Sequence, residues 1–515
     1  MPSSLIRGKY VVCKASGKSD PLIIEDGAVF QRDGIIIDVG TFETLACRHS
    51  PDEVLGSDRH IVFPGFVNSH HHGGLLAFQM GTRDLSLEQW TVDRIRRRDI
   101  DPYLDTLYSA FEMIESGITT VQHLHSRSNG PVARIYDSAN QVLKAYQDIG
   151  MRVSYSFGIR DQNRLVYESD EAFLKRLPFD LATEVAEVVL RQGIPLEDNF
   201  QLFEQLYREN RHTARTRIQL AASNLQWCSD RSLIMLRDYS DKYQVPVHMH
   251  LLETRYQKEY AKRRTGGSAI DHLHELDLLG PQLTLGHAVW ATESDIELIA
   301  DTDTRICHSP SSNLRLRSGI APIARFAQHG VRIALGMDDA SINDDRSLLQ
   351  EMRVALRLHR TPGMEDDLLT EAAIFQMATE NGALTTPFGA TIGTLEVGKA
   401  ADIVIMDWQH IAHPYLDASV PIVNALVHLA RTNGIETVLI AGEPVLRNRR
   451  FTRLDKEAAV EELAASLRAP LKPEENRRQL VAERLFPHVK KFYADEKYAW
   501  NNEHRSTFHC MNCRY

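Results

Sequence analysis

Histidines that end apolar, β-branched segments are the residues of this sequence best suited to chemistry. One such segment closes with NSHHH at residues 68–72. Side chains alternate along a strand, so His70 and His72 point to one side and His71 points to the other. Two imidazoles at the end of one strand can bind the same cation, each at about 2.0–2.1 Å. An isolated His-x-His also occurs by chance in polar loops, so this interpretation needs further ligands elsewhere in the chain.

A second segment closes with HMHLLE at residues 248–253 and offers a third imidazole and a carboxylate. His248 and His250 share one face of the predicted strand, so spacing alone does not choose between them. We predict His250 as the ligand because it lies nearer the carboxyl end of the strand, where the sites of parallel barrels form. His248 is then a buried structural histidine one layer down. Glu253 can transfer protons above the same metal.

Two more segments end in residues that complete such a site. His287 follows QLTLG, and Asp338 follows VRIALGM. Three histidines and one aspartate around a cation leave an open position for a water molecule. Asp338 on its own would more often cap a helix or lie in a loop. Five chance placements at the ends of four strands are, however, a poorer explanation than one shared metal site.

The elements that must position these residues are short β-rich segments, which alternate with helical segments between residues 61 and 340. Such alternation predicts βαβ units and a parallel sheet, and eight units predict closure into a (β/α)8 TIM-type barrel of the α/β class. The eight segments are IVFPGFVN from Ile61, GITTVQHL from Gly117, MRVSYSFGI from Met151, RIQLAAS from Arg217, VPVHMHL from Val245, QLTLGHAVW from Gln282, RICHS from Arg305 and VRIALGMDD from Val331.

The flanks of this region predict a different architecture. Residues 1–60 and 390–450 contain short strands with glycine turns, which predicts a small β-sandwich built from both flanks of the chain. The catalytic barrel then occupies residues 61–389. Residues 451–515 have amphipathic spacing and predict a helical C-terminal tail.

Composition excludes several classes of protein. The 515 residues carry a formal net charge of −10, which argues against nucleic acid or an anionic membrane surface as the partner. Six cysteines in a chain of this length do not make a disulfide framework. No apolar segment is long enough for a secretory signal or a membrane span. We therefore expect a cytoplasmic protein whose partner is a small molecule.

A second group of possible metal ligands near the C-terminus is supported by fewer observations. His509, Cys510 and Cys513 include a Cys-x-x-Cys, which can bind zinc, but no second such motif supplies the other ligands. Neighbouring side chains such as His509 and Cys510 are also poorly placed to bind one ion together. The alternative is a polar C-terminus that packs on a neighbouring subunit.

Taken together, the motifs resemble the amidohydrolase superfamily, in the branch of cytosine, guanine and adenosine-type deaminases and triazine chlorohydrolases. The resemblance covers about residues 5–450 and rests on PGFVNSHHH, HMHLLET, LGHAVW, ICHSPSSNLRLRSGIAP, ALGMDDASINDD and IGTLEVGKAADIVIMD. It implies one divalent metal ion per subunit, with His70, His72, His250 and Asp338 as its ligands. It also implies that Glu253 and His287 handle protons, that GKAAD is a structural turn, and that the protein is a homo-oligomer.

Two departures from the family pattern bear on the site. Asp339 stands where the family usually has a glycine, which changes the expected shape of the pocket. The fourth predicted strand, RIQLAAS, has no lysine that could bridge two cations when carbamylated, so one metal is favoured. Zinc (Zn2+) is the first choice, and iron (Fe2+) is the alternative that suits the same ligands.

The expected reaction is deamination at a C–N bond of a small nitrogen heterocycle or cyclic amidine. A divalent cation lowers the pKa of a bound water from about 15.7 towards 7, which makes hydroxide available for attack. Asp338 would accept the water proton, His287 would stabilise the developing oxyanion, and Glu253 would protonate the ring nitrogen. The alternatives are another leaving group, as in triazine dechlorination or ring-amide opening, and a non-catalytic scaffold. A scaffold predicts missing ligands, and none is missing.

Residues just after the strand ends are candidates to bind the substrate. An amide such as that of Gln226 can bond the donor–acceptor edge of a heterocycle, and Trp227 could stack on the ring. Ordinary packing is the alternative for both Trp90 and Trp227, and an internal ion pair is the alternative for Arg160 and Asp161. The full set of candidates is Gln79, Trp90, Arg160, Asp161, Gln226, Trp227 and Asn313.

Overall fold

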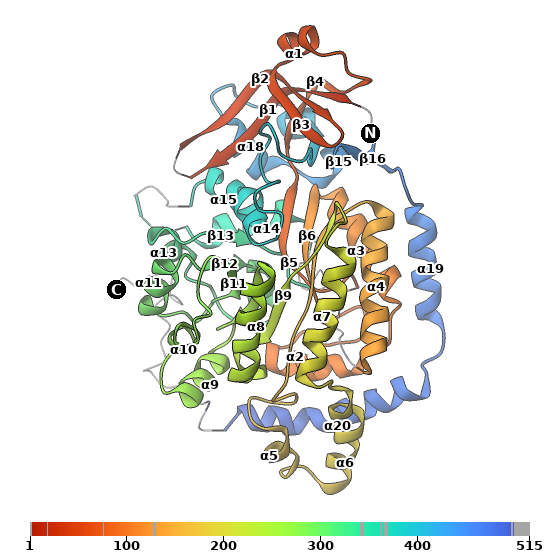
Figure 1. The fold of residues 1–515 in the computed structure, drawn as a ribbon, viewed down its shortest axis with the longest axis vertical. Coiled ribbons are helices and arrows are strands. Elements are labelled where there is room, and N and C mark those ends of the chain that lie inside the picture. The colour runs from red at the N-terminus through yellow and green to blue at the C-terminus, as the bar shows by residue number, and fades with distance from the viewer. Residues whose placement is uncertain are drawn as a thin grey trace.

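The computed structural model describes residues 3–17, 19–75, 77–126, 130–339, 345–360, 363–364, 369–495 and 498. The cluster of His509, Cys510 and Cys513 lies outside these residues. Figure 1 shows a central group of strands surrounded by helices, with a strand-rich layer at the N-terminal end of the molecule.

Parallel strands form the centre of the molecule, and they coincide with the predicted segments. One sheet has four strands in chain order: β5 (Phe66–His71), β6 (Ile118–His125), β7 (Arg152–Phe157) and β8 (Thr216–Ile218). The other has five: β9 (Leu220–Asn224), β10 (Val247–Leu251), β11 (Leu283–His287), β12 (Arg305–His308) and β13 (Ile333–Leu335). The fourth predicted segment is thus divided between β8 and β9.

The two parallel sheets contact each other at both of their edges. On one side, the Gln219 amide donates to the Tyr155 carbonyl at 2.9 Å, just where β8 gives way to β9. On the other side, the Asp338 amide donates to the His70 carbonyl at 2.9 Å. The first parallel strand is therefore hydrogen-bonded to the segment just after the last one, where both carry predicted ligands.

The flanks of the chain join in one eight-stranded mixed sheet. Its order is β17-β16-β15-β14-β4-β1-β2-β3, so β4 and β14 bring the two flanks together as antiparallel neighbours. The bounds are β1 (Ser4–Ser16), β2 (Ser19–Arg32), β3 (Ile35–Thr41), β4 (Glu53–Pro64), β14 (Ile403–Asp407), β15 (Ile435–Ile440), β16 (Glu443–Arg447) and β17 (Arg450–Phe451). Apolar side chains from both flanks form one shared core, which includes Ile6, Val11, Ile36, Val62, Ile403 and Leu439.

The first predicted strand differs from the structure in a specific way. Residues 61–64 belong to β4 of the flanking sheet, and β5 begins only at Phe66. Gly65 separates them, and a Cβ at this position would lie 2.2 Å from the Thr119 hydroxyl. The chain can change sheets here because glycine leaves room for this close approach.

Helices follow the parallel strands because their sequences present one apolar face. In α4 (Val132–Ile149), the buried residues Ile135, Ala139, Val142, Tyr146 and Ile149 recur every three or four positions, and the helix ends at Gly150 with φ of 84°. The other long helices are α3 (Pro102–Glu115), α7 (Leu196–Asn210), α8 (Asp230–Tyr243), α9 (Arg255–Thr265), α11 (Glu293–Asp301) and α14 (Leu348–Leu358). Among the described helices, none combines the length and apolarity that a membrane crossing requires.

Two helices follow the flanking sheet. Figure 1 shows α19 (Lys456–Arg468) along the outside of the molecule and α20 (Pro473–Tyr493) across its far end, next to α6 (Phe179–Val188). In addition to α6, α20 contacts α2 (Leu87–Asp93) and η1 (Arg94–Arg96). Its buried face belongs to a separate apolar cluster whose members include Val92, Tyr167, Phe173, Val185, Val481, Leu485, Val489 and Phe492. This cluster fixes α20 beside the carboxyl ends of the parallel strands.

Candidate metal centre

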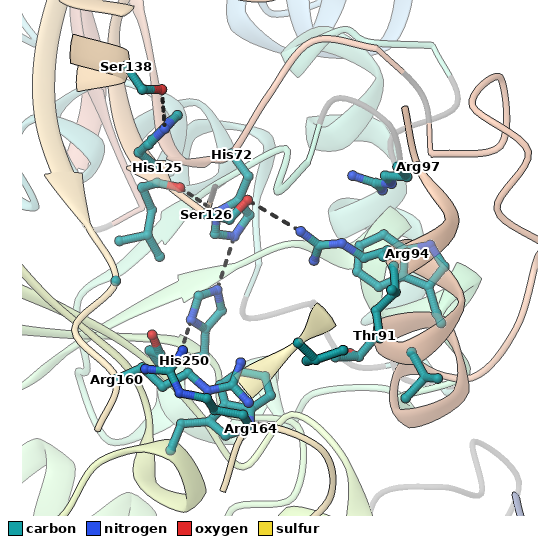
Figure 2. Close-up of a pocket in the computed structure, with 18 of the residues that line it drawn as sticks. His72, Thr91, Arg94, Arg97, His125, Ser126, Ser138, Arg160, Arg164 and His250 are labelled. Carbon is teal, nitrogen blue, oxygen red and sulfur yellow. Dashed lines mark hydrogen bonds between the residues drawn. The ribbon is translucent and has the colours of Figure 1, made fainter. Parts of the chain in front are cut away.

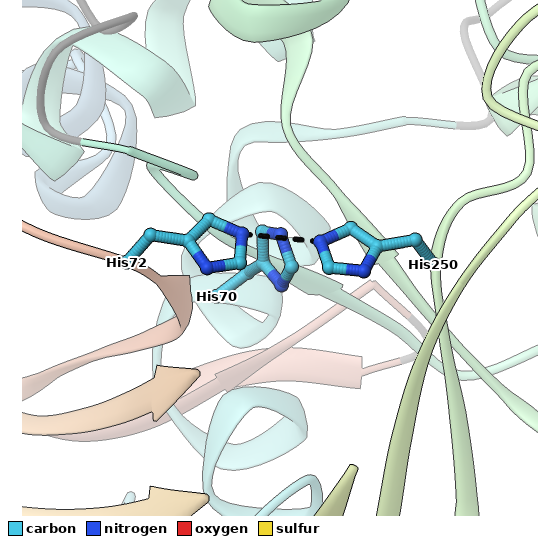
Figure 3. A group of neighbouring side chains, drawn as sticks. All are labelled: His70, His72 and His250. Atoms are coloured by element: carbon cyan, nitrogen blue, oxygen red, sulfur yellow. Dashed lines mark hydrogen bonds between the residues drawn. The ribbon is translucent and has the colours of Figure 1, made fainter. Parts of the chain in front are cut away.

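Three histidine side chains converge at the ends of β5 and β10. The Nε2 atoms of His72 and His250 lie 3.1 Å apart, and a ring nitrogen of His70 completes a group whose members lie within 4.8 Å of one another. Figure 3 shows the rings of His72 and His250 facing each other across His70. Within the described chain, the buried Nε2 of His70 has no hydrogen-bond partner. A buried nitrogen without a partner fits a metal ligand.

Asp338 and His287 approach the same point from β13 and β11. The Asp338 Oδ1 atom lies 3.6 Å from the His70 Nε2 and 3.4 Å from the His72 Nε2. The Nε2 of His287 lies 3.9 Å from the Asp338 Oδ2. His70, His287 and Asp338 form a second group with ligand atoms within 4.8 Å. The predicted ligands therefore lie together in the structure.

Two residues of this site have strained backbone conformations. His287 has a φ of 73° and Asp338 a φ of 59°, in the left-handed region that non-glycine residues seldom adopt. Such conformations cost about 1–3 kcal/mol each and persist where the surroundings hold a functional geometry. The strain is consistent with side chains that are aimed at a common point.

The second nitrogen of each imidazole is anchored by a neighbouring group. A backbone carbonyl accepts a hydrogen bond from Nδ1 in two rings, so Nδ1 carries the proton and Nε2 keeps its lone pair for a cation. The anchoring contacts are His72 Nδ1 to the Leu124 carbonyl (2.6 Å), His250 Nδ1 to the Ser223 carbonyl (2.7 Å), His70 Nδ1 with the His248 Nε2 (2.8 Å), and His287 Nδ1 with the Asn313 Oδ1 (2.9 Å). The donor set thus fits a divalent cation.

The protonation states agree with this fit. Burial lowers the pKa of His70 to about 4 and lowers the pKa of His72 and His250, so these imidazoles are neutral at pH 7. Burial alone would raise the pKa of Asp338, but its interactions with His70, His287 and His72 hold this pKa well below the ordinary value. Three neutral imidazoles and one carboxylate are the forms that bind metal.

Glu253 lies beside this group and is only 4% exposed. Its Oε2 lies 3.9 Å from the His287 Nε2, and its backbone amide donates to the Gln257 Oε1 at 2.8 Å. Burial raises the pKa of Glu253 to about 7, with the charge of Asp338 acting in the same direction. A carboxyl group with this pKa can both give and take a proton near neutral pH.

A cavity of about 580 Å³ opens above the candidate metal-binding residues. His72, His250, Glu253, His287 and Asp338 line it on one side. The other walls come from α2 and η1, from the segment after β7, and from α20 through Arg478. Figure 2 shows His72 and His250 at this cavity together with Thr91, Arg94, Arg160 and Arg164.

The predicted substrate-binding residues lie in different surroundings. Trp90 lines the cavity, with the Arg94 guanidinium 4.4 Å from its ring centroid. Gln79 is exposed and accepts a hydrogen bond from Arg346 at 2.8 Å. Gln226 is buried, and its carbonyl accepts from Asn163 at 2.8 Å. Gln79 and Gln226 are not among the described residues that line the cavity, so their contact with a substrate stays a prediction.

Three other candidates have defined contacts. Asn313 is the partner of His287 and is not among the lining residues described. Trp227 lines the cavity under the Arg160 guanidinium, 4.7 Å from the ring centroid. Asp161 accepts from the Ser229 amide at 2.8 Å, and no ion pair with Arg160 is found among the described residues. The expected alternative of an internal ion pair is therefore wrong.

Several positioning residues were not predicted from the sequence. The Ser312 hydroxyl donates to the Asp338 Oδ2 at 2.5 Å, and Gln257 holds the backbone of Glu253. Asp339, which replaces the usual glycine, lies 3.8 Å from the Arg97 guanidinium. Ser312 stands in the motif ICHSPSSN, and this motif was the only signal available for it.

Comparison with known proteins agrees with the fold and with the site. Residues 61–445, more than half of the chain, match the sequence model of the amidohydrolase family, so the chain belongs to this family. A 5-methylthioadenosine/S-adenosylhomocysteine deaminase from Syntrophobacter fumaroxidans is 27% identical over 465 residues, which cover 89% of this chain and 95% of the relative.

Solved structures show the same fold. A zinc-bound adenosine deaminase from Xanthomonas campestris superimposes with a TM-score of 0.76 at 23% identity, covering 93% of this chain and 98% of the other. A triazine hydrolase from Arthobacter aurescens superimposes with a TM-score of 0.78 at 21% identity, covering 91% of this chain and all of the other. These neighbours imply a TIM-barrel type α/β fold for this chain.

Proposed function

We propose that the protein is a metal-dependent deaminase that replaces an amino group of a small nitrogen heterocycle, or of a cyclic amidine, with the oxygen of water. The observation that carries this proposal is the convergence of three neutral imidazoles and one ionised carboxylate beside Glu253, whose pKa is about 7. The name of the Syntrophobacter relative, a deaminase of adenine-containing compounds, supports the same reaction class.

His70, His72, His250 and Asp338 would hold one divalent cation per subunit. When bound, the cation supplies Lewis acidity and lowers the pKa of a coordinated water towards neutrality. Zinc is our first choice because the donors are imidazole nitrogens and a carboxylate oxygen, and because the adenosine deaminase neighbour contains zinc. Iron(II) is the alternative that the same donors suit.

The residues of the chain then divide the proton transfers among them. Asp338 accepts the proton of the attacking water, while the Ser312 hydroxyl holds its Oδ2 in place. His287, 3.9 Å from both carboxylates, orients this water and stabilises the oxyanion that develops. Glu253 donates a proton to the ring nitrogen next to the attacked carbon, which makes that carbon more electrophilic. The amino group finally leaves as ammonia with a proton from the water.

The finer points of the architecture belong to the same proposal. The contacts at both edges of the parallel sheets support a closed (β/α)8 barrel. The core shared by the two flanks supports a small β-sandwich built from both flanks of the chain. A cytoplasmic location and a homo-oligomer stay predictions.

A coupled ammonia-release screen tests the function. Zinc- and iron-loaded protein is incubated with purines, pyrimidines, pterins and triazines, and each hit is repeated with the Glu253→Gln variant. Ammonia release that this variant abolishes supports the proposal. Chloride release, or formation of a new carboxylate without ammonia, would instead support another leaving group. Protein that binds no divalent metal, and gains no activity when metal is restored, would support the scaffold alternative.

A further inference from the structure

Arginines dominate the polar lining of the cavity, although the chain as a whole is acidic. The arginines are Arg94, Arg97, Arg98, Arg134, Arg160, Arg164 and Arg478, and the carboxylates are Asp99, Asp137, Glu253 and Asp338. Two of these carboxylates belong to the proposed catalytic site. The part of the cavity away from the metal-binding residues is therefore strongly basic.

Some of these arginines have structural partners. The Arg478 guanidinium on α20 forms a 2.8 Å ion pair with Asp99. Arg98 donates to the carbonyls of Leu467 and Ala469, which fixes the segment between α19 and α20. These contacts explain why Arg98 and Arg478 are present without reference to a ligand.

No ion pair or structural role of this kind explains the presence of Arg160. It follows β7 by three residues, donates to the Asn163 carbonyl at 3.0 Å, and lies over the ring of Trp227. Its Nε is buried and has no hydrogen-bond partner among the described residues. No described carboxylate forms an ion pair with it. Burial, together with the neighbouring charge of Arg164, lowers the pKa of Arg160 to about 9.

Arg164 also lacks an ion-pair partner among the described residues. The structure records no hydrogen bond or ion pair for its guanidinium within the described chain, and burial lowers its pKa. The two carboxylates that act on it from further away are engaged elsewhere. Asp161 accepts from the Ser229 amide at 2.8 Å, and Asp170 accepts from the Leu165 amide at 3.0 Å.

Two partly buried guanidinium groups without a counter-ion are costly to keep in a fold. They repel each other and have lost part of their hydration, and the more distant charges of Asp161 and Asp170 offset these costs only in part. An oxyanion bound between them would offset both, because a guanidinium forms charge-assisted, often bidentate hydrogen bonds with carboxylate and phosphate groups. Their location on the cavity wall leaves them accessible to a ligand in the same cavity as the metal-binding residues (Figure 2).

We infer that the substrate is an anionic aminoheterocycle, whose carboxylate or phosphate pairs with Arg160 and Arg164 while its amino-bearing ring lies at the metal-binding residues. This inference rests on the proposed deaminase function for the ring, but the anion site stands on its own geometry. The anion site restricts the substrate class to molecules whose carboxylate or phosphate is separate from the amino-bearing carbon that is attacked.

Matched ligand pairs test the inference by binding alone. Calorimetry with the zinc-loaded full chain compares pterin with pterin-6-carboxylate, and adenosine with adenosine 5′-monophosphate, so each pair differs only in the oxyanion. We expect at least one anionic ligand to bind about 10- to 100-fold more tightly than its neutral counterpart. Arg160→Gln and Arg164→Gln should each remove most of this difference without changing the affinity for the neutral ligand. The pair that responds distinguishes carboxylate from phosphate.

Arg176→Gln is the matched control, because Arg176 lies in the same segment, pairs with Glu168 at 2.7 Å and is outside the cavity. It should leave the preference intact. Equal affinities within both pairs, no binding of either anionic ligand, or equal losses for anionic and neutral ligands in the arginine variants would overturn the inference. Preferential anion binding without release of ammonia from any amine would overturn the deaminase function and leave the anion site standing.

Discussion

The Nδ1 of His70 lies 2.8 Å from the Nε2 of His248, directly beneath the proposed metal-binding group. With Nε2 of His70 as the ligand atom, Nδ1 carries the proton and donates it to His248. His248 is buried, and burial holds its pKa well below the ordinary value, so its Nε2 is available as an acceptor. We therefore propose that the second histidine of HMH is a metal ligand, and that the first orients His70, a proposed ligand on β5 of the other parallel sheet.

Removal of this support should weaken metal binding. We expect His248→Ala to lower the affinity for zinc about 10- to 100-fold, the range found when the outer partner of a metal-binding histidine is lost. Competition with a chromophoric chelator measures the change. His428→Ala is the control, since His428 pairs with Glu371 away from the cavity. Wild-type zinc affinity in His248→Ala would contradict the orienting role.

Glu253→Gln should retain the metal and lose about 10²- to 10⁴-fold in turnover, because an amide keeps the shape of the side chain but transfers no proton. Metal analysis and steady-state rates on the same preparation give both quantities. A variant with a near-wild-type rate would exclude Glu253 as the proton donor.

The pH dependence of the rate follows from the same residue. Its raised pKa of about 7 means that Glu253 is protonated below pH 7 and ionised above it. If the protonated form donates to the ring, kcat/KM should fall as the pH rises through about 7. The residual rate of Glu253→Gln should lack this step. A wild-type profile that is flat from pH 6 to 9 would argue against the assignment.

Asn313 should matter through His287, because its Oδ1 lies 2.9 Å from the His287 Nδ1. We expect Asn313→Ala to lower kcat by about 10-fold or more, with little change in metal content, because the imidazole loses the partner that fixes its orientation. Asn210→Ala, on the outer helix α7, is the control. A larger effect on KM than on kcat would instead indicate direct contact with the substrate.

The turn GKAAD should affect stability and not catalysis. Its Asp402 forms two hydrogen bonds of 2.8 Å with Arg152 of β7, and these residues are only 4% and 3% exposed. Asp402→Ala leaves a buried guanidinium unpaired, which should cost about 3–5 kcal/mol in the free energy of unfolding. Thermal and denaturant unfolding measure this loss.

Glu53→Gln provides the comparison, because the Glu53–Arg447 pair is exposed to solvent and should contribute at most about 1 kcal/mol. Equal stability of the two variants would show that the Arg152–Asp402 pair is not important for joining the two parts of the fold. At temperatures where the Asp402 variant is folded, its metal content should equal that of the wild type.

Much of the site could be predicted from the sequence because the proposed ligands follow directly after predicted strands. His70, His72, His250 and Asp338 each follow an apolar segment, and parallel strands bring such positions to one end of the fold. The expected positions of the strands were confirmed apart from two divisions: the fourth segment is split between β8 and β9, and the first is split at Gly65, where the constraint is a close contact with Thr119. A contact between distant residues leaves no pattern in the local sequence.

The walls of the cavity could be predicted only in part, at Trp90, Arg160 and Trp227, for a related reason. Arg478 belongs to a helix whose sequence predicts only an amphipathic surface, with no sign of a cavity. The groups that anchor the proposed ligands His72 and His250 are the backbone carbonyls of Leu124 and Ser223, which any residue type could supply. The sequence predicts Arg160 and Asp161 as candidate pocket residues, with an internal ion pair between them as the alternative. The structure shows that the two side chains have separate neighbours, which adjacency in sequence does not reveal.

The position of α20 has a consequence for how the enzyme matures during synthesis. A nascent chain that has emerged as far as the flanking sheet already contains every proposed ligand, but the cavity still lacks the wall that Arg478 supplies. The apolar face of α6 also stays uncovered until α20 has been synthesised. Ribosome-bound intermediates of this length would therefore expose both the proposed metal-binding site and an apolar surface. We expect chaperones to bind such intermediates.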